Sequence, residues 1–212
     1  MKSIRLFLFL IISFSISLAQ DLKPISLPPP QTEIGKPLMQ ALKLRQSSRN
    51  FDIKPLPLQE LSNLLWAAYG INRPEDEKRT APSAMNWQEI DIYVMMQNGT
   101  YMYDAKSNSL LLMSKKDLRE ATGKQSFVKE APLNLVYIAD AKRMTRANEE
   151  DKIRWSSADA GFIAQNVYLY CASQGLAVVV RGMVDRETLT QELKLRSEQK
   201  IILSQTVGYP KQ

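Results

Sequence analysis

The stretch that decides the fold is residues 90–104, which read IDIYVMMQNGTYMYD. Apolar residues occupy every second position from 90 to 96, and this period of two is typical of a β-strand. Asn98 and Gly99 follow, a pair that favours a two-residue hairpin turn because both residues tolerate positive φ. Strand-forming side chains resume at 101–103. The sequence therefore predicts a β-hairpin in the middle of the chain.

Helix and strand signals are mixed on both sides of this hairpin. Apolar spacing, caps and turn residues predict helices at 38–44, 58–69, 115–121, from Ser156 or Ser157 to 174, and at 186–193 after an Asp185 cap. Further strands are expected at 110–112, 133–139, 176–180 and 201–207, with a loop over 71–88. The βαβ alternation and the glycine-rich loop of a Rossmann sheet are absent, so the pattern predicts an α+β domain.

Composition excludes several classes of chemistry. Of 212 residues 44% are hydrophobic and 24% charged, which excludes wholesale disorder. The chain has no histidine and one cysteine, so a histidine-based triad, a His/Cys zinc cage and an internal disulfide are all excluded, and no metal site is expected. Any reaction here must use other side chains or a borrowed cofactor.

The first 19 residues have the pattern of a secretory signal peptide. Lys2 and Arg5 precede an apolar run, and Ser17 to Ala19 supplies small residues for cleavage after Ala19. We therefore expect a secreted or periplasmic protein without a stable membrane anchor after cleavage. The alternative is an uncleaved anchor, although serines interrupt a short apolar stretch.

The remaining chain divides into an arm and one domain. Residues 20–37 contain five prolines and predict an extended arm or linker, and residues 38–212 form the domain. Without Lys2 and Arg5 the net charge falls from +6 to +4, and the cations are scattered along the sequence. A solvated surface explains them better than a nucleic-acid interface.

Four short segments carry candidate ligand-binding residues. In the first, Arg45, Ser47 and Arg49 alternate after a helix, so an extended chain would point them the same way, toward a phosphate or a polar ring edge. The alternative is a solvated loop. The other three segments are Pro82, Ser83, Ala84 and Asn86 before the hairpin, Arg181, Gly182 and Met183 after a buried strand, and Lys211 near the end. Small residues and a strand-end glycine permit close approach of a flat ligand. The alternatives are an ordinary loop for the 82–86 segment, a turn for the 181–183 segment and a frayed tail for Lys211.

Taken in order, these segments resemble the motifs of the nitroreductase-like FMN oxidoreductases. The matching pieces are Arg45-x-Ser47-x-Arg49-x-Phe51, Arg79 to Ala84 with Asn86, Tyr101-x-Tyr103-Asp104, Asp159-Ala160-Gly161 with Gln165-Asn166, and Gly208-Tyr209-Pro210. The third and fourth are similar to the branch that includes azoline (thiazoline/oxazoline) dehydrogenases. The resemblance implies an α+β fold with a central mixed sheet flanked by helices, and a homodimer that binds FMN at its interface.

The resemblance also implies roles for the candidate residues. Arg45 and Lys211 would hold the phosphate, and Ser47 and Arg49 would contact the ribityl and pyrimidine side. The 82–86 residues would line the ring from the partner subunit, and the 181–183 segment would lie near the reactive ring nitrogen. The function expected is that of a secreted FMN-dependent oxidoreductase acting between an unidentified donor and a small-molecule acceptor. The alternative is a non-catalytic flavin-binding or interaction module on the same fold, in which Met85 and Met183 crowd the ring. An azoline dehydrogenase is a third reading, which rests on the branch resemblance alone.

Overall fold

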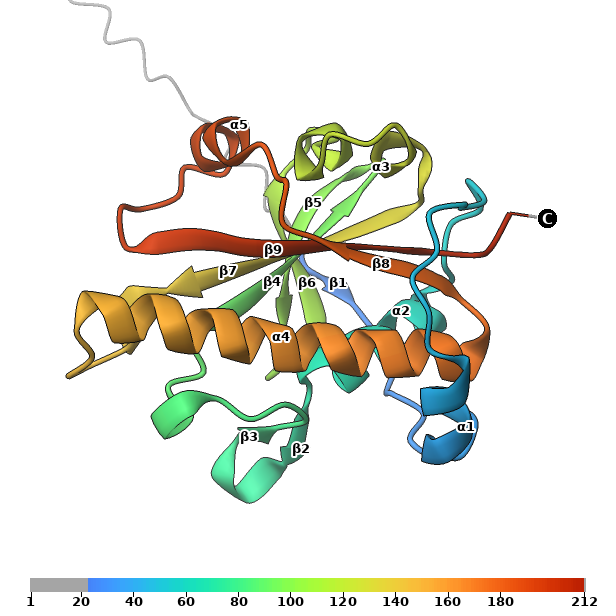
Figure 1. Ribbon diagram of the computed structural model, residues 1–212, viewed down its shortest axis with the longest axis horizontal. Coiled ribbons are helices and arrows are strands. Elements are labelled where there is room, and N and C mark those ends of the chain that lie inside the picture. Colours follow the sequence, from blue (N-terminus) through green and yellow to red (C-terminus); the bar gives the residue numbers. More distant parts are fainter. Residues whose placement is uncertain (1–22, 212) are drawn as a thin grey trace, which may run out of the picture.

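A seven-stranded sheet forms the centre of the molecule, and every described strand pair in it is antiparallel (Figure 1). The computed structural model describes residues 23–211, so the expected signal peptide at 1–19 lies outside the described residues. The strand order is β1-β6-β5-β4-β7-β9-β8. The strands are β1 (Ile25–Ser26), β4 (Ile90–Met96), β5 (Gly99–Asp104), β6 (Ser109–Ser114), β7 (Leu133–Asp140), β8 (Ala177–Arg181) and β9 (Gln199–Gly208).

The predicted hairpin is confirmed as β4 and β5, in which Met96 pairs with Gly99 across the turn. The alternation in β4 sorts side chains to two buried faces rather than to one. Ile92 and Val94 pack in the larger core, whereas Tyr93 and Met95 pack in a second core on the opposite face. The sheet is therefore covered on both sides.

Helices α2 (Leu58–Tyr69) and α4 (Glu149–Gln174) cover the face with the larger core, and α5 (Arg186–Glu192) covers the other (Figure 1). The shorter helices are α1 (Leu38–Leu44) and α3 (Phe127–Glu130). The expected spans of α1, α2 and α5 are confirmed, and the Asp185 side chain caps α5 by accepting from the Thr188 N–H. No helix among residues 23–211 is long and apolar enough to cross a bilayer.

Helix α4 begins seven residues before the expected Ser156 start, at Glu149. The Asn148 side chain accepts a hydrogen bond from the Asp151 N–H and so caps the helix. The acidic residues at 149–151 occupy the first turn, where negative charge stabilises the helix dipole. The prediction read this polar run as a segment before the helix, because it lacks the apolar spacing that marks the later turns.

We expected a mixed central sheet, but every described pair of neighbouring strands in it is antiparallel. Strands β7 and β8 run in the same direction, as the crossover through α4 requires, but β9 lies between them and pairs antiparallel with both. The mixed sheet was an expectation from the family resemblance, and no local pattern in the sequence shows that β9 separates β7 from β8.

Two segments are more ordered than the sequence suggested. In the proline-rich arm, Ile25 pairs with Leu110 as part of β1, and the Pro28 carbonyl accepts a hydrogen bond from Ser62 on α2. The arm therefore packs on the domain. The expected loop at 71–88 contains a small hairpin of β2 (Ile71–Arg73) and β3 (Lys78–Arg79). The helix expected at 115–121 is instead a 3₁₀ turn at Arg119–Thr122.

Replacing Gly175 tests the left-handed end of α4. Gly175 has φ of 76° and no atom within 4 Å of an added Cβ, so a substitution there strains the backbone without a clash. We expect Gly175→Ala to lower the free energy of unfolding by about 1 kcal/mol. Urea unfolding followed by circular dichroism measures it. Gly175→Asn is the control, because asparagine tolerates this conformation and the variant should lose clearly less unfolding free energy. Equal losses in the two variants would contradict the explanation.

Candidate functional site

The segment that contains Arg45, Ser47 and Arg49 runs beside strand β8. The Arg45 N–H closes α1 by donating to the Ala41 carbonyl, and after this the chain leaves the helix. The Ser48 N–H then donates to the Val178 carbonyl at 2.8 Å. This hydrogen bond places the segment against β8, the strand that leads to Gly182.

Tyr168 on α4 fixes this segment, and sequence reasoning missed it as a site residue. Its hydroxyl lies 2.8 Å from the Ser47 Oγ and accepts from the Val180 N–H at 2.9 Å. The Arg45 guanidinium lies over the Tyr168 ring, 5.4 Å from its centroid. One side chain thus joins α4, the 45–49 segment and β8. The position of Tyr168 on a mostly apolar helix suggested packing alone, and no local signal in the sequence marks the hydroxyl contacts.

The end of the described chain lies against the same segment. Phe51 and Pro210 form an isolated β-bridge, and the Lys211 N–H donates to the Asn50 carbonyl at 3.2 Å. The backbone of Lys211 is therefore held beside Asn50 and is not frayed. Across residues 23–211, Arg45, Arg49 and Lys211 form no ion pair. We call these three residues the cationic corner.

The side chain of Arg181 points into the protein and not toward a surface site. Arg181 is 7% exposed, and its guanidinium donates to the Thr122 carbonyl at 2.7 Å and also to Asn134 and Thr206. Burial disfavours the charged form and lowers the pKa of Arg181 to about 10. The accessible groups at this strand end are therefore the next two residues, Gly182 and Met183, which are both exposed.

The loop with Pro82, Ser83, Ala84 and Asn86 has an unusual backbone. Met85, Asn86 and Gln88 all have positive φ, at 50°, 54° and 48°. Asparagine tolerates this region, whereas methionine and glutamine adopt it at a cost of roughly 1–2 kcal/mol each. The Ala84 N–H donates to Asp159 on α4 at 2.9 Å, and the Gln88 N–H donates to the Ser83 Oγ at 3.0 Å.

The candidate residues form two separate sets on one chain. Tyr168 holds the first set, and Asp159 holds the 82–88 loop nine residues earlier on the same helix. At 1.5 Å per residue the two anchors are about 14 Å apart along α4. The structure thus places the 45–49 segment beside β8 and the backbone of Lys211 beside Asn50, and it leaves the 82–86 residues apart from them.

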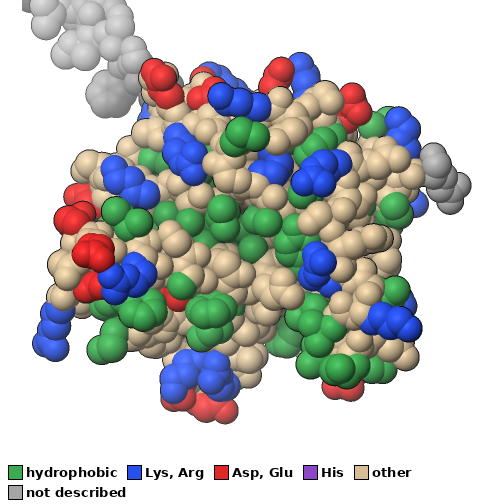
Figure 2. Space-filling model, in the orientation of Figure 1, with side chains coloured by type: hydrophobic (Ala, Val, Ile, Leu, Met, Phe, Trp, Pro, Cys, Tyr) green, Lys and Arg blue, Asp and Glu red, His purple; other side chains and the backbone are tan. Residues whose placement is uncertain are grey.

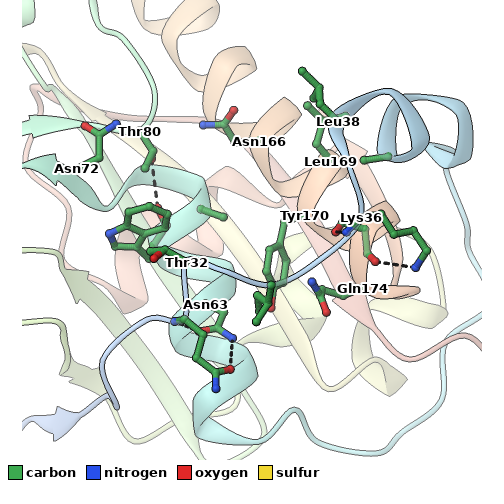
Figure 3. A pocket seen from close by; sticks show the side chains of 16 residues that line it. Thr32, Lys36, Leu38, Asn63, Asn72, Thr80, Asn166, Leu169, Tyr170 and Gln174 are labelled. Atoms are coloured by element: carbon green, nitrogen blue, oxygen red, sulfur yellow. Dashed lines mark hydrogen bonds between the residues drawn. The ribbon is translucent and has the colours of Figure 1, made fainter.

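A cavity in the described part of the chain lies elsewhere. It has a volume of about 430 Å³ between the arm, α1, α2 and α4, and Asn63, Asn166 and Tyr170 line it (Figure 3). None of the predicted site residues lines this cavity. No group of three or more acidic or cysteine side chains placed to hold a metal occurs between residues 23 and 211.

Removing the Tyr168 hydroxyl tests its role as the anchor of the first set. Tyr168→Phe leaves the Val180 N–H and the Ser47 hydroxyl without this partner, so we expect a loss of about 1–2 kcal/mol in unfolding free energy. Tyr170→Phe is the matched control. It removes a hydroxyl that donates to the half-buried Glu60 carboxylate, which water can solvate, and should cost less. A larger loss in the control would contradict the anchor role.

Comparison with known proteins identifies the domain. Residues 42–209 match the Nitroreductase family. The protein named "Putative nitroreductase MJ1384" from Methanocaldococcus jannaschii is 32% identical over an alignment of 182 residues, which covers 77% of this chain and 90% of that protein. A crystal structure of the same description from Ralstonia eutropha JMP134 is 46% identical, with a TM-score of 0.85 over 89% of this chain and 90% of that one.

One further likeness concerns the fold alone. The Escherichia coli microcin synthetase McbBCD complex with truncated pro-MccB17 bound contains a chain that is 17% identical to this one. Its TM-score is 0.68, over 98% of this chain and 85% of that one. The match over residues 42–209, the identity to both nitroreductase relatives and the shared α+β architecture agree, and the protein belongs to the nitroreductase family.

Proposed function

We propose that this protein is an FMN-dependent oxidoreductase that passes electrons or hydride between an unidentified donor and a small-molecule acceptor. The cationic corner is the observation that carries the proposal. Arg45 and Arg49 lie on the segment beside β8, the backbone of Lys211 is bonded to the same segment at Asn50, and none of the three has a carboxylate partner among the described residues. Cations without an acidic partner on one stretch of backbone favour an anionic ligand such as a phosphate.

The residues present fit the parts of FMN. Arg45 and Lys211 would bind the phosphate, and Ser47 would contact the ribityl chain. Arg49 at the pyrimidine edge would favour reduction, because negative charge develops there. Gly182 has open space where a Cβ would be, which permits a flat ring to approach the backbone. When bound, FMN would supply the redox chemistry that this chain lacks, since its side chains provide no histidine and one buried cysteine.

A homodimer would complete this site. The loop at 82–86 lies about 14 Å along α4 from the first set, so a second copy of the chain would supply the loop that lines the ring. Exposed apolar side chains on α1 and α4 support such an interface, and hydrophobic groups gather over this face (Figure 2). They are Leu38, Met39, Leu42, Ile153, Trp155 and Phe162. Burying such residues is the main driving force of association.

The expected signal peptide supports a secreted or periplasmic location for this activity. Nicotinamide cofactors are expected to be scarce there, so we propose a different, extracytoplasmic electron donor. Stopped-flow mixing of the FMN-loaded protein with NADH or NADPH tests this donor assignment. Slow or absent bleaching of the flavin absorbance is the expected result, and rapid bleaching would contradict it.

Replacing Arg45 tests the phosphate assignment. We expect Arg45→Ala to weaken FMN binding by roughly 1.5–3 kcal/mol, the range for a hydrogen bond to a charged group. Quenching of FMN fluorescence in a titration measures the affinity. Lys43→Ala is the matched control, because Lys43 is an exposed cation in the last turn of α1 and lies outside the predicted set. Equal affinity of wild type and Arg45→Ala would remove Arg45 from the site.

The non-catalytic alternative has one observation in its favour. Met85 is 82% exposed and Met183 is 58% exposed, so both long side chains are free to cover the face of a ring bound beside them. Turnover of the FMN-loaded protein with reduced methyl viologen as donor and a quinone or nitroaromatic acceptor separates the two functions. Catalytic turnover supports the oxidoreductase, whereas bound flavin without turnover supports the module.

A further inference from the structure

Two carboxyl groups are buried together beneath the 82–88 loop, and the proposed function does not use them. Glu89 directly follows the loop and is 0% exposed, while Asp159 on α4 is 1% exposed. The charge on Asp159 is close enough to raise the pKa of the Glu89 carboxyl. Neither oxygen of Glu89 has a hydrogen-bond partner among the described residues.

The surrounding charges do not neutralise this pair. Arg143 contacts Asp91 and donates to the Gln88 carbonyl, and Arg79 donates to the Gln88 side chain and lies over the Tyr69 ring. The Tyr69 hydroxyl is also buried near the pair and has no partner in the described structure. These groups face the pair from α2, β3, β4 and the 141–143 turn, and each guanidinium is already engaged.

One proton resolves this arrangement. Two ionised carboxylates can only accept hydrogen bonds, so they cannot bond to each other, and two buried like charges repel. Burial and the neighbouring Asp159 raise the pKa of Glu89 to about 7, and burial also raises the pKa of Asp159. The proton belongs to the pair as a unit. With one proton, Glu89 donates to Asp159, and Asp159 still accepts from the Ala84 N–H.

The loop depends on this anchor because its backbone is strained. Met85 and Gln88 adopt left-handed conformations that such residues otherwise avoid. Hydrogen bonds from the Ala84 N–H to Asp159, and from Arg79 and Arg143 to Gln88, oppose that strain. Asp159 is the anchor at the end of the loop that would face a ligand.

We propose that Glu89 and Asp159 share one proton and together form a latch that holds the 82–88 loop in its ligand-binding shape. Both are positioning residues, since they act on the ligand through the loop. The effect on flavin rests on the proposed function, whereas the effect on the loop does not.

The sign of the pH dependence follows from the raised pKa of Glu89. The proton stabilises the closed loop, so the stabilisation is present at low pH and is lost as pH rises through about 7. Above that pH the pair ionises fully and repels, and the bond between the Ala84 N–H and Asp159 is released.

Hydrogen exchange of the Ala84 amide in the protein without flavin tests the latch directly. After correction for the intrinsic exchange rate, we expect protection in the wild type to fall at least tenfold between pH 6 and pH 8.5, about the effect of one pH unit of proton linkage. In Glu89→Gln the side-chain amide of the new glutamine donates to Asp159 at every pH. The protection of the Ala84 N–H should therefore stay constant with pH. Protection that is constant in the wild type, or that falls equally in Glu89→Gln, would overturn the proposal.

A second variant and a control keep the test decisive. In Asp159→Asn the new side chain can donate to ionised Glu89 and still accept from the Ala84 N–H, so this variant should also abolish the pH dependence of the Ala84 protection. It replaces Glu89→Gln in the test if that variant does not fold. Glu60→Gln changes another half-buried carboxyl, at the α2–α4 contact with Tyr170, and should retain the wild-type pH dependence. A pH-independent Glu60→Gln would show that the effect is not specific to the pair.

A parallel titration with FMN separates this proposal from the proposed function. We expect the FMN dissociation constant of the wild type to rise about tenfold or more over the same pH range, and that of Glu89→Gln to change clearly less. If no FMN binds at any pH, the proposed function fails, and the exchange of the Ala84 amide still decides the latch. If FMN binds and its affinity changes equally with pH in both proteins, the latch does not position the loop for flavin.

Discussion

The burial of one face of α4 against the antiparallel sheet is the constraint on which the rest of the structure depends. Ile163, Val167 and Cys171 are fully buried on this face, and the Gln205 side chain of β9 donates to the Ala164 carbonyl in the middle of the helix. Once the helix is fixed in rotation, Asp159 and Tyr168 have fixed directions. These two side chains hold the 82–88 loop and the 45–49 segment, so the candidate site takes its geometry from the packing of a single helix.

The sequence predicted those features of the fold that local interactions determine. The β4–β5 hairpin, the start of α2 after Pro57 and the end of α4 at Gly175 each follow from residues within one turn or one strand. The insertion of β9 between β7 and β8 depends on pairing between strands far apart in the chain, and no local pattern encodes it. The early start of α4 was missed because a capped acidic turn has no apolar period.

The candidate site shows the same division. The motif order located the 45–49 segment and the end of the chain, which the structure brings together. The direction of a side chain was not predictable, because it depends on partners from other elements. Arg181 is buried against Thr122, Asn134 and Thr206, which come from the turn before α3, from β7 and from β9. The exposed neighbours Gly182 and Met183, and not Arg181 itself, face the surface.

The position of β9 has a consequence for the order of folding. The strand that pairs with both β7 and β8 is β9, which follows them in the sequence, and the residues after β9 complete the cationic corner. Until β9 is present, the backbone N–H and C=O groups along one edge of β7 and one edge of β8 have no partner strand, a state that favours aggregation. A chain made from its N-terminus therefore cannot complete the cationic corner before β9 and the residues after it are available.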